Sequence, residues 1–192
     1  MKVNLTIGIP SWLDRVCAWP VTAYRRRKYG YPFRRIYLGE GEWTIVDPQD
    51  YYRFGHFKWW LSGNGNNLYA ARSFKTEPLR TTITHLHRQI MNPPPDLLVD
   101  HRNCDSLDNR RANLRIATHE ENMRNRRKRK NTSSRYIGVH FDKRSGRWAA
   151  HIRYKGKKIW LGYFDSEIEA ARAYDMAAKR YHIDFARLNF SE

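Results

Sequence analysis

The stretch "VDHRNCDSLDNRRANLRIATHEEN", residues 99–122, decides how this chain is interpreted. Two short apolar runs, "LLVDH" and "ANLRIAT", stand on either side of a polar loop and predict two strands. "THEE" predicts a capping box, with Thr118 as the cap and Glu121 three residues later. We therefore expect a helix to begin after Thr118. The predicted order over residues 98–131 is therefore strand, loop, strand, helix.

Four polar side chains on this strand–loop–strand–helix frame suggest a site for metal-assisted acid–base chemistry. Mg²⁺ prefers oxygen ligands, and Asp100 offers a carboxylate while Asn122 offers an amide oxygen. His101, with an ordinary pKa of about 6.5, can serve as a neutral base, and Asn113 can hydrogen-bond its imidazole. Adjacent strand residues point to opposite faces, so Asp100 and His101 share one site only if the strand ends or bulges there. An ordinary Asp–His pair in a turn, with capping asparagines, is the alternative.

The segments "VDH", "LDNRRANLRIAT" and "HEEN" resemble the HNH endonucleases of the ββα-metal type, in the group often found as free-standing homing enzymes. The resemblance implies that Asp100 and Asn122 bind a single Mg²⁺ or Mn²⁺ ion. It further implies that His101 is the general base and that Asn113 positions it. The intervals of twelve residues from His101 to Asn113 and of nine residues from Asn113 to Asn122 fit this pattern, and Asn122 fits it better than the nearby His119.

Residues 135–190 predict a second domain. "YIGVHF", "RWAAHIRY" and "KKIWLGYF" are expected strands of an antiparallel sheet, separated by "DKRSG" and Lys155–Gly156. Alternation places Arg147, His151 and Arg153 on the face opposite Trp148 and Ile152, and it places Lys158 and Trp160 opposite Ile159 and Leu161. A helix should begin after Ser166, where Ser166 and Glu169 form a second capping box. We expect it to cover the apolar face of the sheet and to leave the basic face exposed.

The motifs "GRWAAHIR", "WLGYF", "EAARAYDMAA" and "LNF" resemble the DNA-binding domain of plant ethylene-response factors, the apetala class. The resemblance implies a sheet that enters the major groove of DNA. It implies DNA contacts from the outer face, which we assign to Arg147, His151, Arg153, Lys158 and Trp160. The chain departs from the plant pattern by carrying Ile137, His140, Asp142 and His151 at positions of that surface, so the preferred DNA sequence is expected to differ. Core packing is the alternative role for Trp160.

The chain is strongly basic, with 36 Lys and Arg against 19 Asp and Glu among 192 residues, a formal net charge of +17. This excess favours a polyanionic partner, and we predict double-stranded DNA. The run Arg126, Arg127, Lys128, Arg129 and Lys130 is expected to contact phosphates, although a solvated tether is its alternative. The two cysteines form no CxxC pair, and no signal peptide or membrane span is recognised at the start of the sequence. We therefore expect an intracellular, cytoplasmic or nucleoid-associated protein with no small-molecule cofactor.

The expected fold class is α+β, in three parts. Residues 1–35 are expected to be an irregular basic arm. Residues 36–131 are expected to form the nuclease domain, with its core at 98–131 after a β-rich region that contains a hairpin around "SGNGNN". Residues 132–192 are expected to form the ethylene-response-factor-type domain. His85 and His87 could be metal ligands, but packing is the better interpretation because no third ligand stands nearby.

Three functions compete at this point. The leading one is a sequence-tolerant, metal-dependent endonuclease of the homing type that cuts double-stranded DNA. A DNA-binding transcriptional regulator with an inactive nuclease domain is the second. An RNA-binding or ribosome-associated protein is the third. The sequence leaves open the target site, nicking versus double-strand cleavage, and the oligomeric state.

Overall fold

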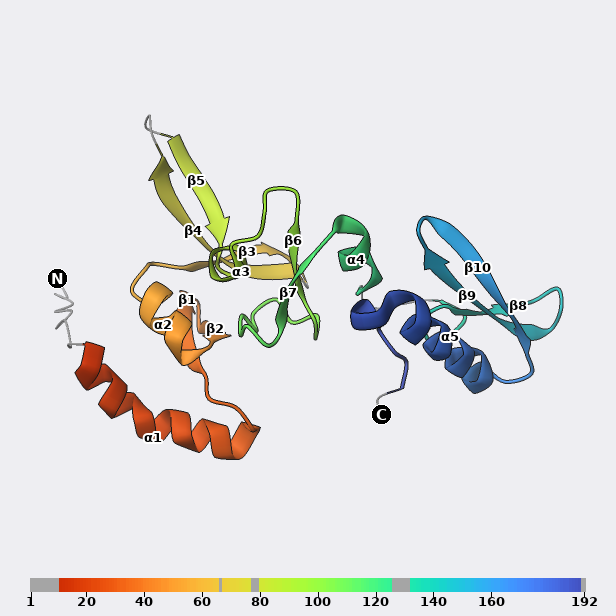
Figure 1. Ribbon diagram of the computed structural model, residues 1–192, viewed down its shortest axis with the longest axis horizontal. Coiled ribbons are helices and arrows are strands. Elements are labelled where there is room, and N and C mark those ends of the chain that lie inside the picture. Colours follow the sequence, from red (N-terminus) through yellow and green to blue (C-terminus); the bar gives the residue numbers. More distant parts are fainter. Residues whose placement is uncertain (1–10, 66, 77–79, 126–131, 191–192) are drawn as a thin grey trace. The chain divides into compact units, whose positions relative to one another are not determined.

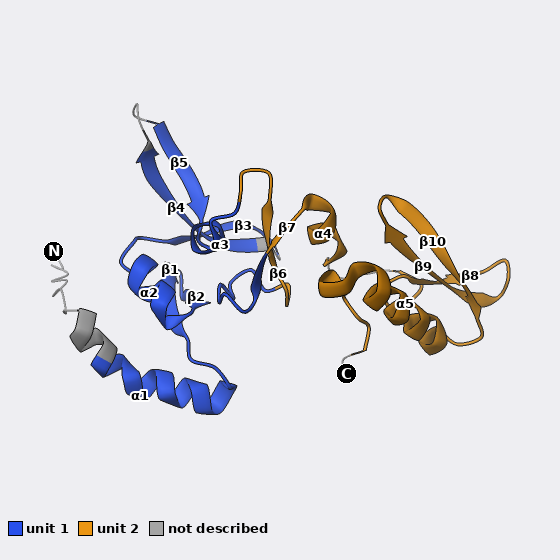
Figure 2. Cartoon of the chain, viewed as in Figure 1, with its two compact units in different colours: residues 1–93, 105–115 blue, residues 94–104, 116–192 orange. Residues whose placement is uncertain are grey.

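The computed structural model describes residues 11–65, 67–76, 80–125 and 132–190 of the chain. The fold is α+β with antiparallel sheets, as expected (Figure 1). The chain divides into two compact units, residues 1–93 with 105–115 and residues 94–104 with 116–192 (Figure 2). These units cut across the domain ranges expected from the sequence, which stay predictions.

The described residues of the first unit form two small sheets and three helices. One sheet pairs β1 with β2, and the other has the order β3-β4-β5. The elements are α1 (Ser11–Tyr29), β1 (Arg34–Gly39), β2 (Glu42–Val46), α2 (Pro48–Phe54), β3 (Trp60–Asn64), β4 (Asn67–Thr76), β5 (Arg80–His85) and α3 (Leu86–Met91).

The expected irregular arm is wrong over residues 11–29, which form α1. Pro20 lies inside this helix, and the Thr22 hydroxyl donates to the carbonyl oxygens of Ala18 and Trp19 at 3.0 Å. Pro20 removes one backbone donor, and the helix continues on both sides of it. The basic character was read correctly, because the last turn carries Arg26, Arg27 and Lys28.

The hairpin around "SGNGNN" is confirmed, since β3 pairs antiparallel with β4 from Trp60↔Ala71 to Asn64↔Asn67. The short helix α2 was not foreseen. It follows Asp47 in extended conformation, with a proline at its first position, where the missing N–H costs nothing. The helix packs Phe54 into the core, and the Trp59 indole N–H donates to the Phe54 carbonyl at 2.8 Å.

His85 and His87 pack rather than face solvent. Their rings are stacked with centroids 5.4 Å apart, and each also contacts the ring of Tyr69. Burial, with Arg88 nearby, lowers the pKa of His85. These contacts agree with a structural role for both residues.

The second unit carries β6, β8, β9, β10, α4, α5 and a 3-10 turn, η1. β7 has residues in both units and pairs with β6 as a two-stranded sheet. The elements are β6 (Leu98–His101), β7 (Leu114–Ala117), α4 (His119–Arg124), β8 (Val139–Asp142), β9 (Arg147–Tyr154), β10 (Lys157–Phe164), α5 (Glu167–His182) and η1 (Ile183–Phe185). The strand, loop, strand, helix order of residues 98–124 is therefore observed.

The sheet β10-β9-β8 packs one face on α5 (Figure 1). Both predicted capping boxes are present, at Thr118–Glu121 and Ser166–Glu169. Small side chains on α5 let it lie close to the sheet, where Ala170, Ala171 and Ala178 are fully buried beside Ala150 and Ile152. This burial stabilises the domain and turns the opposite face of the sheet outward.

Hydrogen bonds attach Asn189 and Phe190 to the rest of this domain. The buried carboxylate of Asp175 accepts hydrogen bonds from the backbone N–H groups of Asn189 and Phe190 and from the Asn189 side chain, at 2.8–3.1 Å. The Asn189 side chain in turn accepts from the Ile137 N–H at 2.6 Å and donates to the Ile137 carbonyl at 3.2 Å. The motif "LNF" thus joins the start, the helix and the end of the domain.

Candidate functional site

The outer face of the β8–β10 sheet presents the side chains expected from alternation. In the β9–β10 register, Lys158 pairs with Arg153 and Trp160 pairs with His151. Paired residues share a face of a sheet. Trp160 is 49 % exposed, which rules out core packing as its role. The expected face is therefore observed.

Sequence alternation missed one member of this face, Tyr163. A β-bulge between Trp160 and Gly162 inserts an extra residue, and Gly162 adopts φ of +127°. The bulge shifts the alternation, so that Tyr163 pairs with Ala149 on the outer face and Phe164 turns into the core. The glycine in "WLGYF" was the available signal. The Tyr163 ring packs edge-on against Trp160, with centroids 4.8 Å apart.

A hydrogen bond anchors this aromatic pair. The Tyr163 hydroxyl donates to the Asp142 carboxylate at 2.7 Å, which lowers the pKa of Asp142 and raises that of Tyr163. His140 and His151 pack edge-on nearby, with ring centroids 5.4 Å apart. The outer face is thus a preorganised aromatic surface rather than a set of separate flexible side chains.

Two like charges stand directly opposite each other on this face. Arg153 and Lys158 are exposed and cross-strand paired, an arrangement that costs stability unless a negative group lies between them. Arg147 differs, because its guanidinium is held by Asp165 at 2.9–3.0 Å. The expected phosphate contacts Arg126, Arg127, Lys128, Arg129 and Lys130 lie outside the described residues.

The Asp100–His101 pair lies at the end of β6, the position required for both residues to serve one site. The backbone N–H of Cys104 donates to the His101 carbonyl at 2.9 Å as the chain turns. Asp100 and His101 are 4 % and 7 % exposed. The expected strand ending is therefore observed.

Asn125, which the sequence argument did not single out, holds this pair. Its side-chain amide donates to both Asp100 carboxylate oxygens, at 2.9 and 3.1 Å, and to the His101 carbonyl at 2.7 Å. It follows Asn122 by three residues, so helical spacing was the available signal. The Cys104 thiol donates to the Asn125 carbonyl at 2.9 Å, and Arg187 donates to that same carbonyl at 3.0 Å.

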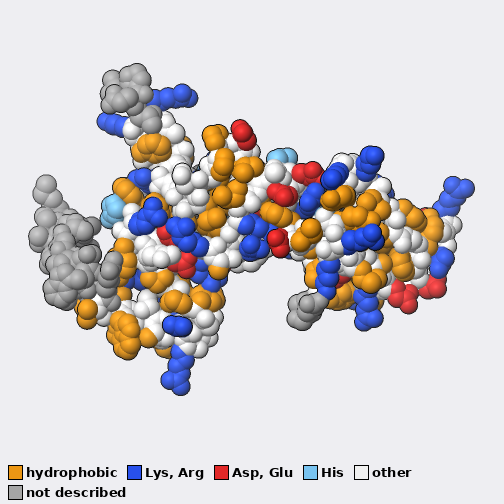
Figure 3. Space-filling model, viewed as in Figure 1, with side chains coloured by type: hydrophobic (Ala, Val, Ile, Leu, Met, Phe, Trp, Pro, Cys, Tyr) orange, Lys and Arg blue, Asp and Glu red, His pale blue; other side chains and the backbone are white. Residues whose placement is uncertain are grey.

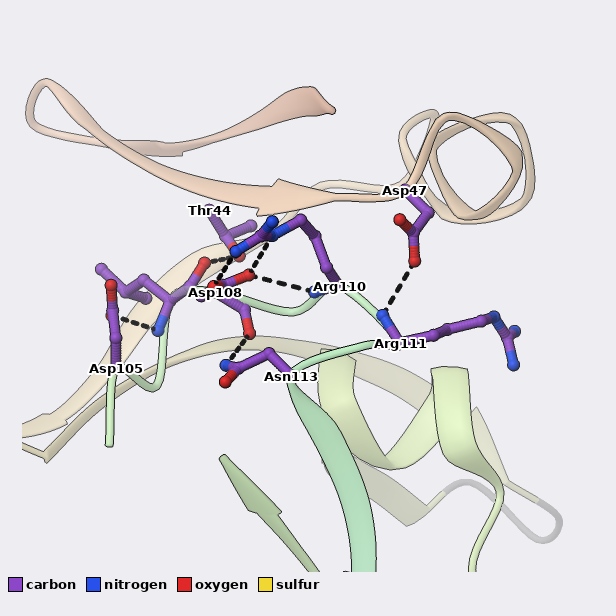
Figure 4. Close-up of polar contacts among 8 residues, drawn as sticks. Thr44, Asp47, Asp105, Asp108, Arg110, Arg111 and Asn113 are labelled. Carbon is purple, nitrogen blue, oxygen red and sulfur yellow. Dashed lines mark hydrogen bonds and ion pairs between the residues drawn. The ribbon is translucent and has the colours of Figure 1, made fainter. Parts of the chain in front are cut away.

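The other two expected site residues, Asn113 and Asn122, lie on different segments of the chain from the Asp100–His101 pair. Asn122 is half-buried on α4, where its backbone N–H donates to the Thr118 carbonyl, and His119 is exposed. Asn113 belongs to the first unit, whereas Asp100, His101 and Asn122 belong to the second. The Asn113 amide donates to the Asp108 carbonyl at 2.8 Å (Figure 4). The roles of Asn113 as orienter and Asn122 as metal ligand stay predictions.

Within the first unit, residues 105–113 are attached to the segment around Thr44 and Asp47 by a network of polar contacts (Figure 4). Thr44 donates to the Leu107 carbonyl at 2.7 Å, and the buried Asn109 amide donates to Thr44 at 2.8 Å. Arg110 forms a two-bond ion pair with Asp108 and lies over the Tyr31 ring at 3.5 Å. The hydrogen bonds to Asp108 raise the pKa of Arg110. The loop is therefore rigidly positioned.

The carboxylate oxygens of Asp100 are the type of ligand that a hard cation such as Mg²⁺ prefers. A carboxylate has about four lone-pair sites, and Asn125 uses two of them. Mg²⁺ commonly takes one or two protein oxygens and fills its shell with water and substrate phosphate. Within the described ranges, no group of three His, Cys, Asp or Glu side chains is arranged to hold a metal ion. A metal here would depend on Asp100, an amide oxygen and the substrate.

Two family models match parts of the chain. Residues 134–183 match the AP2 domain, and residues 92–124 match an HNH endonuclease model. The AP2 match supports the interpretation of the β8–β10 sheet as a DNA-binding domain. Each match covers much less than half of the chain.

Several curated plant proteins are similar over the C-terminal part. The AP2-like ethylene-responsive transcription factor TOE2 of Arabidopsis thaliana is 46 % identical over 67 residues, which is 35 % of this chain and 14 % of the relative. The AP2/ERF and B3 domain-containing transcription factor RAV1 of the same plant is 47 % identical over 64 residues, 33 % of this chain and 18 % of the relative. The ethylene-responsive transcription factor ERN1 of Medicago truncatula is 34 % identical over 87 residues, 44 % of this chain and 32 % of the relative. The chain thus spans a third or less of these relatives. No solved structure matches.

No helix in the described ranges combines the length and the apolar character needed to cross a membrane.

Proposed function

We propose that this chain is a DNA-binding regulator that holds duplex DNA on the outer face of its β8–β10 sheet. The observation that carries the proposal is the exposed, preorganised surface on which Arg153 faces Lys158 beside Trp160. Arginine can pair with a guanine edge or a phosphate, and a tryptophan ring can pack on the sugar backbone. The similarity to plant transcription factors over this domain supports the same function.

The double variant Arg153→Ala/Trp160→Ala tests this proposal. We expect its affinity for a 20-base-pair duplex, measured by fluorescence anisotropy at about 100 mM salt, to fall roughly 10- to 100-fold, as expected for losing one arginine and one ring contact. Arg172→Ala/Met176→Ala is the matched control, because it removes an exposed arginine and an exposed apolar side chain from α5. An equal loss in both variants would mean that bulk charge, not this face, binds DNA. A structured RNA competitor that displaces duplex DNA efficiently would instead favour the RNA-binding alternative.

A metal-dependent endonuclease of the HNH type, acting on double-stranded DNA, is the second candidate. It is favoured by the Asp100–His101 pair at the end of β6, close to α4, in the region that matches the HNH model. In this function Asp100 and Asn122 would hold one Mg²⁺ or Mn²⁺ ion, which would polarise the phosphate when bound. His101 would accept the proton of the attacking water, and Asn113 would orient the imidazole.

Supercoiled plasmid separates the two candidates. The regulator leaves the plasmid intact with Mg²⁺ or Mn²⁺. The endonuclease yields nicked or linear products that disappear with chelator and in His101→Ala, while His119→Ala, one exposed imidazole removed from the same region, keeps cutting. Cleavage that persists in His101→Ala would point to a contaminating nuclease and would count against the endonuclease function.

A further inference from the structure

The first unit contains an open cavity of about 860 Å³. It is lined by residues of α2, of the loop after α2, of β4 and of α3, and Arg111 also lines it. We call it the arginine–aromatic pocket, and its principal lining residues are Tyr52, Arg53, His56, Phe57, Arg72 and Arg111. Its volume is in the range of small-ligand sites in proteins.

Aromatic rings support the cationic side chains of this pocket. The Arg72 guanidinium lies 3.7 Å from the centroid of the Phe57 ring, and its Nε donates to the Gln89 side chain at 3.0 Å. The His56 ring packs against Phe57 with centroids 3.9 Å apart and is exposed to solvent. Partial burial lowers the pKa of Arg72, in keeping with a cation that has lost some of its water. Such a cation gains more from an incoming anion than a fully hydrated one.

Positive charge exceeds negative charge around the pocket. The Arg111 guanidinium makes two bonds of 2.8 Å to Asp50, a fully buried carboxylate. The Arg111 backbone N–H donates to Asp47, and its side chain extends away from Asp108 (Figure 4). Arg53 is 3.9 Å from Asp50 and 62 % exposed. The two carboxylates of Asp47 and Asp50 thus stand against three arginines. Arg53 is mostly exposed and Arg72 donates to the neutral Gln89 side chain, so both can still bind an anion.

Arginines beside accessible rings match the chemistry of a nucleotide. Guanidinium groups bind phosphate, and aromatic rings stack on a base. The bases of a duplex already stack on one another, so a ring can stack only on an unpaired base. Figure 3 shows that Lys and Arg side chains are scattered over the visible surface. Positive charge alone would therefore not distinguish this pocket, but its combination with aromatic rings does.

We propose that the arginine–aromatic pocket binds a nucleotide of single-stranded DNA, with Arg53 and Arg72 on the phosphate and the base against His56 and Tyr52. This site is separate from the β8–β10 sheet and does not depend on its function. It would give the chain a preference for DNA that is locally opened or carries an unpaired end.

The test uses a labelled 12-nucleotide single strand and the full chain, by fluorescence anisotropy with chelator present. We expect the double variant Arg53→Gln/Arg72→Met to weaken binding about tenfold, the loss expected when two arginine–phosphate contacts are removed. Methionine keeps apolar bulk over Phe57. Lys58→Gln/Lys75→Gln is the matched control, because both lysines are exposed, lie in the same unit and do not line the pocket.

Three results of these measurements would overturn the proposal, and the sheet variant described below adds a fourth. One is an equal loss in both double variants, which would indicate bulk charge. Another is displacement of the strand by inorganic polyphosphate as effectively, per phosphate, as by unlabelled single strand, which would leave the base without a role. If circular dichroism shows that the double variant is unfolded, the single variant Arg53→Gln is used instead, because the Arg53 side chain is exposed and its substitution leaves folding intact. An unchanged affinity of Arg53→Gln for the single strand would then contradict the pocket.

Arg153→Ala/Trp160→Ala separates this site from the sheet. We expect it to lose duplex binding and to keep single-strand binding within about twofold. Loss of both at once would mean that single strands bind on the sheet, and it would overturn the pocket while supporting the sheet.

Discussion

Alanine in place of Gly138 is expected to destabilise the C-terminal domain by about 3 kcal/mol, the sum of a left-handed backbone penalty and overpacking. Gly138 has φ of +75°, and its carbonyl accepts from the His151 N–H at 2.9 Å. A Cβ at this position would lie 2.0 Å from the Tyr174 ring and 2.7 Å from the His151 carbonyl oxygen. The tyrosine is buried against the sheet and the oxygen belongs to the backbone, so neither can move cheaply.

Gly146→Ala is the control that separates these two effects. Gly146 has a similar φ of +68°, but nothing lies within 4 Å of the added Cβ. It should cost only the backbone penalty, about 1 kcal/mol. Thermal and urea unfolding followed by circular dichroism measures both. Equal losses in the two variants would show that the close approach of Tyr174 has no energetic weight.

Asp175→Ala is expected to be similarly damaging, at about 3–5 kcal/mol, because it removes a buried acceptor of several hydrogen bonds and leaves backbone donors unpaired. The donors are the N–H groups of Asn189 and Phe190 and the Asn189 amide. Freed from Asp175, Asn189 would also lose its fixed position on Ile137. We therefore expect Asn189 and Phe190 to detach from α5. The domain should then unfold near physiological temperature without a single cooperative transition.

Asp165→Ala is its matched control. Asp165 also pairs with a partner, Arg147, but its side chain is 86 % exposed, and exposed ion pairs contribute at most about 1 kcal/mol. Chemical denaturation of both variants gives the comparison. If Asp175→Ala unfolds no more easily than Asp165→Ala, the closure of the domain by "LNF" is not a major source of its stability.

Local sequence signals predicted most of the C-terminal domain, although β8 (Val139–Asp142) begins three residues later than the expected strand "YIGVHF". β9 and β10 coincide with "RWAAHIRY" and "KKIWLGYF", and α5 begins directly after its predicted cap residue, Ser166. Alternation over eight residues, turn glycines and caps all act within a few residues, so they can be read in order. The bulge at Leu161 was the exception, because one inserted residue reverses every later assignment, and Tyr163 was missed for that reason.

Less of the Asp100 region could be predicted. The strands and the capping box were found, and Asp100 and His101 do share the end of a strand. Asn125 was missed because its spacing from Asn122 indicates only a shared helical face, whereas its role depends on a tertiary contact with Asp100. Attachment of residues 105–113 to Thr44, Asp47 and Asp50 was equally invisible, because those partners lie some 60 residues earlier. The pocket arises from elements that are neighbours only in the folded unit.

That attachment constrains the order in which the protein can form during synthesis. Thr44 and Asp50 leave the ribosome long before Leu107 and Arg111, which are separated from them by 63 and 61 residues. Until then Asp50 has no guanidinium from Arg111, and its charge favours hydration over burial. The nascent N-terminal part therefore stays incomplete while residues 94–104 emerge, and it matures only when a later stretch of chain returns to it.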